Sequence, residues 1–154
     1  MILMIAPVNT QAAVKTKTLK GLGTYTYDTK KKTATLKTAW IDKGFVYMPY
    51  GICIGKKAYK VTKISKNAFK GYEKTVEFIE SDSPFTTIET DTFNLPNANH
   101  IGFSKLPYDV KFKKNAFRKI NKKCEFSVAT KKIKNNLRKY NRHIKSKNVN
   151  VVGE

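Results

Sequence analysis

The chain has 154 residues and a formal net charge of +20, with 31 Lys and Arg residues against 11 Asp and Glu residues. Hydrophobic residues make up 40% of the chain and aromatic residues 12%, which excludes an intrinsically disordered protein. The length allows a single domain with a core of its own. The charge points to polyanionic partners or to a surface kept soluble by repulsion.

The charge is divided among three segments. Residues 1–71 carry 14 basic residues against two Asp, a net charge of +12, and residues 105–154 carry 16 basic residues against three acidic ones, a net charge of +13. Residues 72–104 between them hold one Lys and six acidic residues, a net charge of −5. The lysines alternate with apolar residues, which is typical of a solvated face of folded structure.

The N-terminal segment at positions 1–13, MILMIAPVNTQAA, is almost wholly apolar from Ile2 to Val8 and ends in two alanines. It resembles the second half of a secretory signal peptide, although a basic start is missing. We therefore expect residues 1–13 to be a signal-peptide remnant and the protein to be secreted or placed at the cell surface. The alternative is an ordinary first strand. No later stretch is apolar and long enough to span a membrane.

Two short segments with alternating side chains follow, at residues 24–28 and 33–37. They are separated by Thr29-Lys30-Lys31-Lys32, so the pattern predicts a β-hairpin. We expect this hairpin to form part of an N-terminal cap over residues 14–58.

The next part of the chain repeats itself with a 24-residue step. Two sets of large apolar residues keep this step: Ile64, Ile88 and Phe112 in one, and Phe69, Phe93 and Phe117 in the other. Trp40 and Phe45 fit the same step one unit earlier. A fixed period in the twenties is the signature of a leucine-rich-repeat solenoid, in which each buried position lies over its counterpart. We expect the two sets to form core ladders within residues 59–128.

The strings around these positions resemble a known family. YKVTKISKNAFKG, from Tyr59 to Gly71, is similar to the unit of the BspA-like leucine-rich repeat, and Val46-Tyr47-Met48-Pro49 is similar to its short strand. The resemblance covers about residues 39–152, and the middle unit departs from it, because Thr92 replaces the usual Ala. It implies a β-rich solenoid outside the cell that binds protein or glycan.

The C-terminal segment, residues 129–154, is expected to close the solenoid as a cap. Ile133, Leu137, Tyr140 and Ile144 fall at helical spacing and predict one apolar stripe of a basic helix. Residues 149–152 are expected to add a last short strand.

Few residues suggest catalysis. Cys53 and Cys124 lie about three repeat units apart, so we expect two free thiols rather than a disulfide. His100 lies one step before Cys124, which would allow a Cys–His dyad, but two neighbouring strand residues are the favoured interpretation. The acidic residues of the middle segment suit a solvated face better than a calcium site or a glycosidase pair. We expect no enzymatic activity, no cofactor and no metal.

Basic residues are the candidate binding residues. Lys63, Lys66 and Lys70 are followed at a step of 48 by Lys111, Lys114 and Arg118. The remaining candidates extend the second group: Lys119, Lys122, Lys123, Lys131 and Lys132. Such a surface attracts polyanions, or it only keeps the β-structure soluble and its edges unpaired.

The sequence therefore predicts a non-enzymatic, secreted or surface-associated binding module. Its expected partner is a host or cell-surface protein, or an anionic glycan or cell-wall polymer. The alternative is a cytoplasmic nucleic-acid-binding protein that uses the two basic ends. Lysine outnumbers arginine by 28 to 3, which argues against base-specific readout of DNA.

Overall fold

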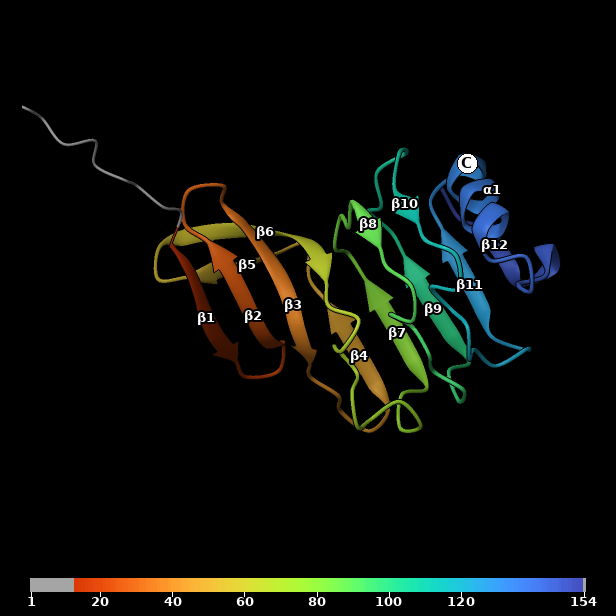
Figure 1. The fold of residues 1–154 in the computed structure, drawn as a ribbon, viewed down its shortest axis with the longest axis horizontal. Coiled ribbons are helices and arrows are strands. Elements are labelled where there is room, and N and C mark those ends of the chain that lie inside the picture. Colours follow the sequence, from red (N-terminus) through yellow and green to blue (C-terminus); the bar gives the residue numbers. More distant parts are fainter. Residues whose placement is uncertain (1–12, 154) are drawn as a thin grey trace, which may run out of the picture.

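The computed structural model describes residues 13–153 as a small mixed α/β fold of two sheets and one α-helix (Figure 1). The first sheet begins with three antiparallel strands and continues with parallel pairs from β3 to β6, β8 and β10, while β5 pairs antiparallel with β6. Its strands are β1 (Val14–Leu19), β2 (Gly23–Asp28), β3 (Thr33–Ala39), β5 (Gly51–Ile54), β6 (Lys57–Ile64), β8 (Thr87–Ile88) and β10 (Lys111–Phe112).

The second sheet is parallel throughout, in the order β4-β7-β9-β11-β12. Figure 1 shows its strands side by side in chain order. They are β4 (Phe45–Met48), β7 (Phe78–Ser81), β9 (His100–Phe103), β11 (Glu125–Val128) and β12 (Val149–Val151). The helix α1 (Lys131–Tyr140) and the 3₁₀ helix η1 (Ser146–Asn148) lie between β11 and β12 in the chain.

Alternation of side chains fixes which face of each strand is buried. On β7, Ile79 and Ser81 point inward, whereas Phe78 and Glu80 face solvent. The inward residues of both sheets join one apolar cluster, which reaches from Tyr25 on β2 to Val149 on β12. A strand with one buried face keeps its register, because a slip of one residue would expose all its apolar side chains.

Three phenylalanines from successive loops pack against one another inside this cluster. The ring centroids of Phe69 and Phe93 are 5.7 Å apart, and those of Phe93 and Phe117 are 5.2 Å apart. Ile88 and Phe112 are partners in the parallel pair of β8 and β10. Thr92 is accommodated in the buried middle unit because its hydroxyl donates to the Glu89 carbonyl at 2.8 Å. All six ladder residues are therefore buried in the core.

The prediction of a leucine-rich-repeat solenoid is nevertheless wrong. The chain forms two sheets of different type with one helix, and the antiparallel strands β1 to β3 are continuous with the first sheet rather than a separate cap. Trp40 and Phe45, which fit the 24-residue step, are each 43% exposed. Leu36, not Trp40, pairs with Ile64. The 24-residue step therefore reflects contacts between three loop-and-strand units within a mixed fold. A repeat of this local kind does not determine the architecture of the whole chain.

Several predicted elements are confirmed as elements. The hairpin at 24–28 and 33–37 corresponds to β2 and β3, and the last short strand corresponds to β12. The predicted helix exists, but it ends at Tyr140, so Ile144 lies beyond it and Tyr140 is exposed.

Both ends of α1 are set by side chains. The hydroxyl of Thr130 accepts from the N–H of Ile133 at 3.3 Å and begins the helix. Asn141, only 1% exposed, ends it by donating to the Leu137 carbonyl at 3.2 Å. The same side chain accepts from the N–H of Phe117 at 3.4 Å, which ties the helix end to the core.

The expected signal-peptide remnant at residues 1–13 lies, apart from Ala13, outside the described residues. Within the described part of the chain, no helix has both the length and the apolar character needed to cross a membrane.

Candidate functional site

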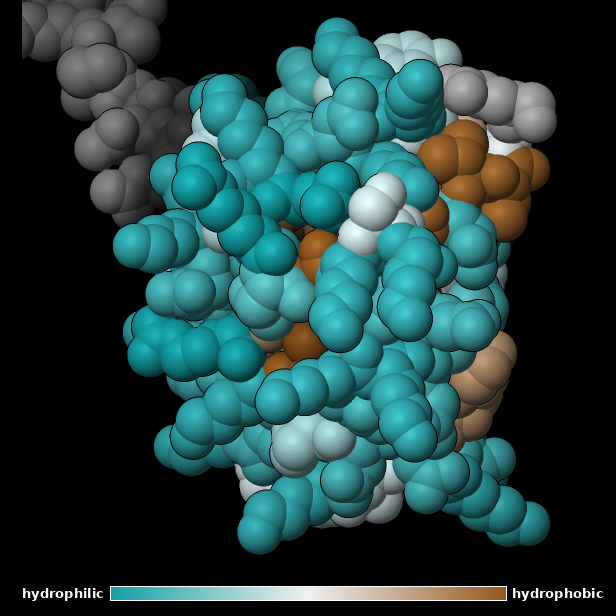
Figure 2. All heavy atoms as spheres, turned by 90° about the vertical axis from the view of Figure 1, so that its right-hand side faces the viewer, coloured by the Kyte–Doolittle hydropathy of each residue, from teal (hydrophilic) through white to brown (hydrophobic). Residues whose placement is uncertain are grey.

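A hollow of about 390 Å³ opens at the C-terminal end of the molecule, between the loop that precedes β11 and the segment that connects α1 to β12. Its bottom is apolar, with Ile120, Phe126 and Ile144, and its rim carries Lys122 and Lys145. The other lining residues are Arg118, Asn121, Cys124, His143 and Asn148. Figure 2 shows this end as a largely hydrophilic surface with apolar atoms at the bottom of a hollow.

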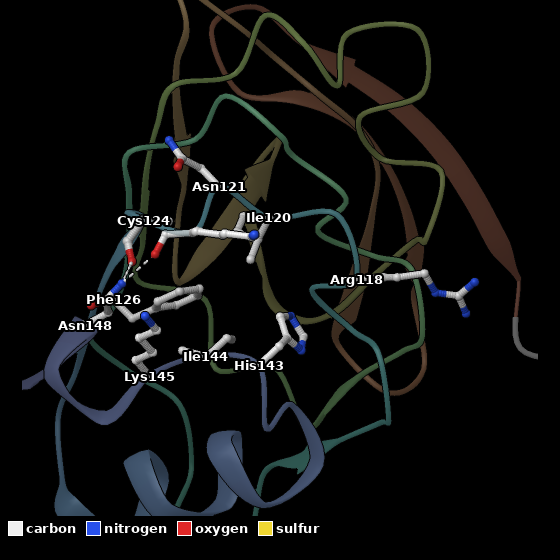
Figure 3. A pocket seen from close by; sticks show the side chains of 10 residues that line it. Arg118, Ile120, Asn121, Cys124, Phe126, His143, Ile144, Lys145 and Asn148 are labelled. Carbon is white, nitrogen blue, oxygen red and sulfur yellow. Dashed lines mark hydrogen bonds between the residues drawn. The ribbon is translucent and has the colours of Figure 1, made fainter.

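Hydrogen bonds to backbone carbonyls hold the walls of the hollow. Asn148 donates to the carbonyls of Lys122 at 2.9 Å and Cys124 at 3.3 Å (Figure 3). His143 Nε2 lies 2.8 Å from the carbonyl oxygen of Phe117. Because both walls are fixed to each other through these bonds, the hollow is a built feature of the fold.

A second hollow of about 440 Å³ adjoins the first and shares His143 with it. Lys114, Lys139 and Arg142 line it, together with Asn115 and Tyr140. We call the two hollows together the basic end face. It is defined by six cationic residues and the shared histidine: Lys114, Arg118, Lys122, Lys139, Arg142, His143 and Lys145. All seven are exposed.

One cation of the basic end face is paired with a carboxylate. Arg118 Nε lies 3.1 Å from Asp91 Oδ1, with both side chains about half exposed. In Figure 3 the Arg118 side chain extends away from the other residues that line the first hollow. A ligand in this hollow would therefore meet Lys122, Lys145 and His143 before Arg118.

The structure brings only some of the predicted binding residues together. Lys114, Arg118 and Lys122 belong to the basic end face. Lys63 and Lys111 form a different group on the first sheet, where Thr87 pairs with both. Adjacent strands lie about 4.8 Å apart, so these two lysines are separated by about 10 Å at the backbone.

The other predicted residues lie outside these two groups. Lys66 and Lys70 line a hollow of about 300 Å³ that also contains Glu73 and Asp91, so its charge is mixed. Lys119 and Lys123 are exposed on the loop before β11, and Lys131 and Lys132 are exposed on the first turn of α1.

Sequence reasoning missed part of the site. Arg142, His143 and Lys145 were not among the predicted binding residues. Two other helix cations support the structure, since Lys134 Nζ donates to the Val149 carbonyl at 2.7 Å and Arg138 Nε to the Ile144 carbonyl at 3.2 Å. One feature of the sequence could have indicated the walls of the first hollow. Asn side chains recur that donate to a backbone carbonyl about one repeat earlier in the chain, as Asn97 does to the Lys74 carbonyl at 2.7 Å.

The contacts of Cys124 and His100 differ from those of a Cys–His dyad. The His100 ring stacks on Phe78, with centroids 4.6 Å apart, and its Nε2 lies 3.1 Å from Glu80 Oε1. Burial raises the pKa of the Cys124 thiol to about 12, with a smaller contribution from Glu125. A thiol with this pKa is protonated at neutral pH and is a poor nucleophile. Cys53 and Cys124 are both free.

Among residues 13–153, no group of three or more His, Cys, Asp or Glu side chains is placed to hold a metal ion. No family model, curated protein or solved structure matches this chain. The resemblance of its strings to the BspA-like repeat therefore stays a prediction.

Proposed function

We propose that this protein is a binding module for an anionic polymer, such as a sulfated or phosphate-bearing glycan or a cell-wall polymer, and that the basic end face is its binding surface. The observation that carries the proposal is the adjacency of two hollows that share His143 and are lined by six cationic residues. Closely spaced cations gain affinity for a polyanion by releasing its counterions.

The shape of the first hollow supports a polymer with rings or short branches rather than a bare ion. Its apolar bottom gives a pyranose ring or a similar group a place to pack, while the lysines on the rim reach charged substituents. The proposal is for recognition without chemistry, in keeping with the protonated Cys124 thiol at the edge of the hollow. A secreted or surface location, expected from the N-terminal segment at positions 1–13, would place the protein among such polymers.

The test measures binding to heparin as a sulfated glycan, duplex DNA and neutral dextran at two salt concentrations. We expect heparin to bind, dextran not to bind, and DNA to bind weakly and to be lost at the higher salt. DNA binding that exceeds heparin binding and survives the higher salt would contradict the proposal and favour the nucleic-acid alternative.

Matched variants separate the basic end face from net charge. The triple variant Lys122→Gln, Arg142→Gln and Lys145→Gln should weaken heparin binding about tenfold or more, because each removed cation contributes to the salt-dependent term. The control variant Lys15→Gln, Lys17→Gln and Lys37→Gln removes the same charge from exposed positions on β1 and β3. Equal losses in both variants would show that net charge alone binds the polymer, and would overturn the site.

A further inference from the structure

The outer face of the second sheet has a composition unlike the rest of the surface. Phe45 and Tyr47 on β4 and Phe78 on β7 point outward and are 43%, 39% and 40% exposed. Large exposed aromatic side chains in a contiguous group mark interaction surfaces more often than isolated ones do. We call the set Phe45, Tyr47, Phe78, Glu80 and His100, with Asp82 and Glu125 at its borders, the aromatic sheet face.

The rings of this face form a row across three strands. The register pairs Phe45 with Phe78 and Phe78 with His100, and the ring centroids are 6.0 Å and 4.6 Å apart. Parallel, in-register strands hold such rings side by side. The row is therefore fixed by the backbone and needs little ordering when a partner binds.

Carboxylates lie beside the rings. The side chain of Glu80 lies over Gly102, where a Cβ atom would collide with its carboxylate, and it pairs with His100. Asp82 accepts hydrogen bonds from the hydroxyls of Ser104 and Tyr47, the latter at 2.8 Å. These two hydrogen bonds, that of Ser104 first, lower the pKa of Asp82, and the charge of Lys105 on the loop after β9 adds a smaller effect, so Asp82 is ionised at neutral pH.

The strands that carry this face lack lysine, although lysine supplies most of the charge of the chain. The five strands of the second sheet, all within the described residues, contain no Lys or Arg, whereas the strands of the first sheet contain seven Lys. The outward positions of β4, β7, β9 and β11 hold Glu80 and Glu125 as their charged residues. In a protein with a net charge of +20, this is a local negative surface built on aromatic rings.

From this complementarity we infer that the aromatic sheet face binds a protein segment that carries arginine or lysine next to apolar residues. The cations would lie against the aromatic rings and near Glu80, Asp82 and Glu125, where cation–π and charge-assisted contacts add to each other. A second copy of the chain is a poorer occupant, because two molecules of charge +20 repel each other far more strongly than a short peptide is repelled. The inference goes beyond polymer binding and gives the protein two separate binding surfaces.

The test titrates the full chain with an acetylated, amidated five-residue peptide that contains two arginines and three leucines. The control peptide has citrulline in place of each arginine, which keeps the shape and removes the charge. We expect amide shift changes in NMR spectra at β4, β7 and β9, and at least fivefold weaker binding of the citrulline peptide. Equal binding of both peptides, or shifts confined to other parts of the chain, would overturn the inference.

Substitutions in the aromatic sheet face test which of its side chains contact the peptide. Glu80→Gln with Glu125→Gln, and separately Phe78→Ala, should each weaken peptide binding at least fivefold. The controls are Glu73→Gln with Glu89→Gln, which removes the same charge elsewhere, and Tyr108→Ala, which removes an aromatic ring that is 65% exposed. Unchanged binding in the face variants, or self-association that depends on Glu80, would contradict the inference.

Substitutions in one binding surface should leave binding at the other surface unchanged. The triple variant of the basic end face should lose heparin binding and keep peptide binding, and Phe78→Ala should do the reverse. Loss of both activities in either variant would mean that the surfaces are not separate and would overturn the inference.

Discussion

The two sheets of this protein differ in how their edge strands are protected from pairing with another chain. The first sheet ends in β1, a six-residue edge strand with Lys15 and Lys17 exposed. The second sheet ends in β4, a four-residue strand whose start is bridged to Asp42. Lysines on an edge strand and short edge strands both discourage pairing with another chain.

The two sheets differ in what their exposed residues indicate about function. Lysines on the first sheet are explained by solubility and edge protection, so their presence alone does not indicate a ligand. The aromatic sheet face has no such explanation, since exposed phenylalanines reduce solubility. The basic end face differs again, because its cations surround hollows rather than following a strand.

The largest expected effect distinguishes the shared core from the outer face of the second sheet. Phe93 is fully buried, and its ring contacts Phe69, Phe103 and Phe117 with centroids 5.2 to 5.7 Å away. Phe93→Ala should lower the free energy of unfolding by about 3 to 5 kcal/mol, because it leaves a cavity between both sheets. Chemical denaturation measures this, with Phe78→Ala as the matched outer-face variant. Similar losses in the two variants would contradict the assignment of Phe78 to the surface.

The next largest effect is a difference in stability between alanine substitutions at two glycines, one in each sheet. A Cβ at Gly23 on β2 would collide with the Thr38 carbonyl, and its φ of +113° lies where other residues are strained. Gly23→Ala should therefore cost about 2 to 4 kcal/mol. Gly102→Ala on β9 meets only the Glu80 carboxylate, which can swing away, so its cost should be about 1 kcal/mol or less. Thermal and chemical unfolding of both variants would show the difference, and a costlier Gly102→Ala would refute it.

The two free cysteines report local access to the two sheets. Cys53 on β5 of the first sheet is exposed, whereas Cys124 beside β11 is buried with a pKa raised to about 12. Iodoacetamide at pH 8 should modify Cys53 quickly and Cys124 only after unfolding. Mass spectrometry of peptides after timed labelling measures both rates. Equal rates would mean that the wall of the basic end face opens freely.

The smallest effect concerns Asp82 at the border of the aromatic sheet face. Its pKa is lowered in the folded state, so its carboxylate stabilises the fold above the unfolded pKa and loses this contribution as the pH falls through the folded pKa. Asp82→Asn should be less stable at pH 7 by about 0.5 to 1 kcal/mol, since water screens this half-exposed group. The difference from the unmodified protein should shrink below about pH 4. A difference that is constant from pH 7 to pH 2 would exclude the ionised carboxylate as its source.

Local structure was predictable from the sequence wherever one strand or one helix determines the pattern. Alternation at 24–28 and 33–37 predicted β2 and β3, and the 24-residue step predicted which phenylalanines lie side by side. The architecture was not predictable in the same way. Before Ile64 the step fails, because Leu36 rather than Trp40 enters the core and pairs with Ile64.

The candidate site was predictable only in part. Lys114, Arg118 and Lys122 were found from their charge, but the hollows form where the loop before β11 meets the segment after α1. That meeting depends on Asn141, which ends the helix at Tyr140 and turns residues 142–145 toward Phe117 and Phe126. A helical stripe that extends to Ile144 gives no indication of this turn.

The most direct test of the two-surface account is an NMR titration of the full chain with a short heparin fragment. We expect amide shift changes at Lys122, His143 and Lys145 and none at Phe78 or Glu80. Shift changes on the aromatic sheet face, or changes spread evenly over the lysines of the first sheet, would contradict it.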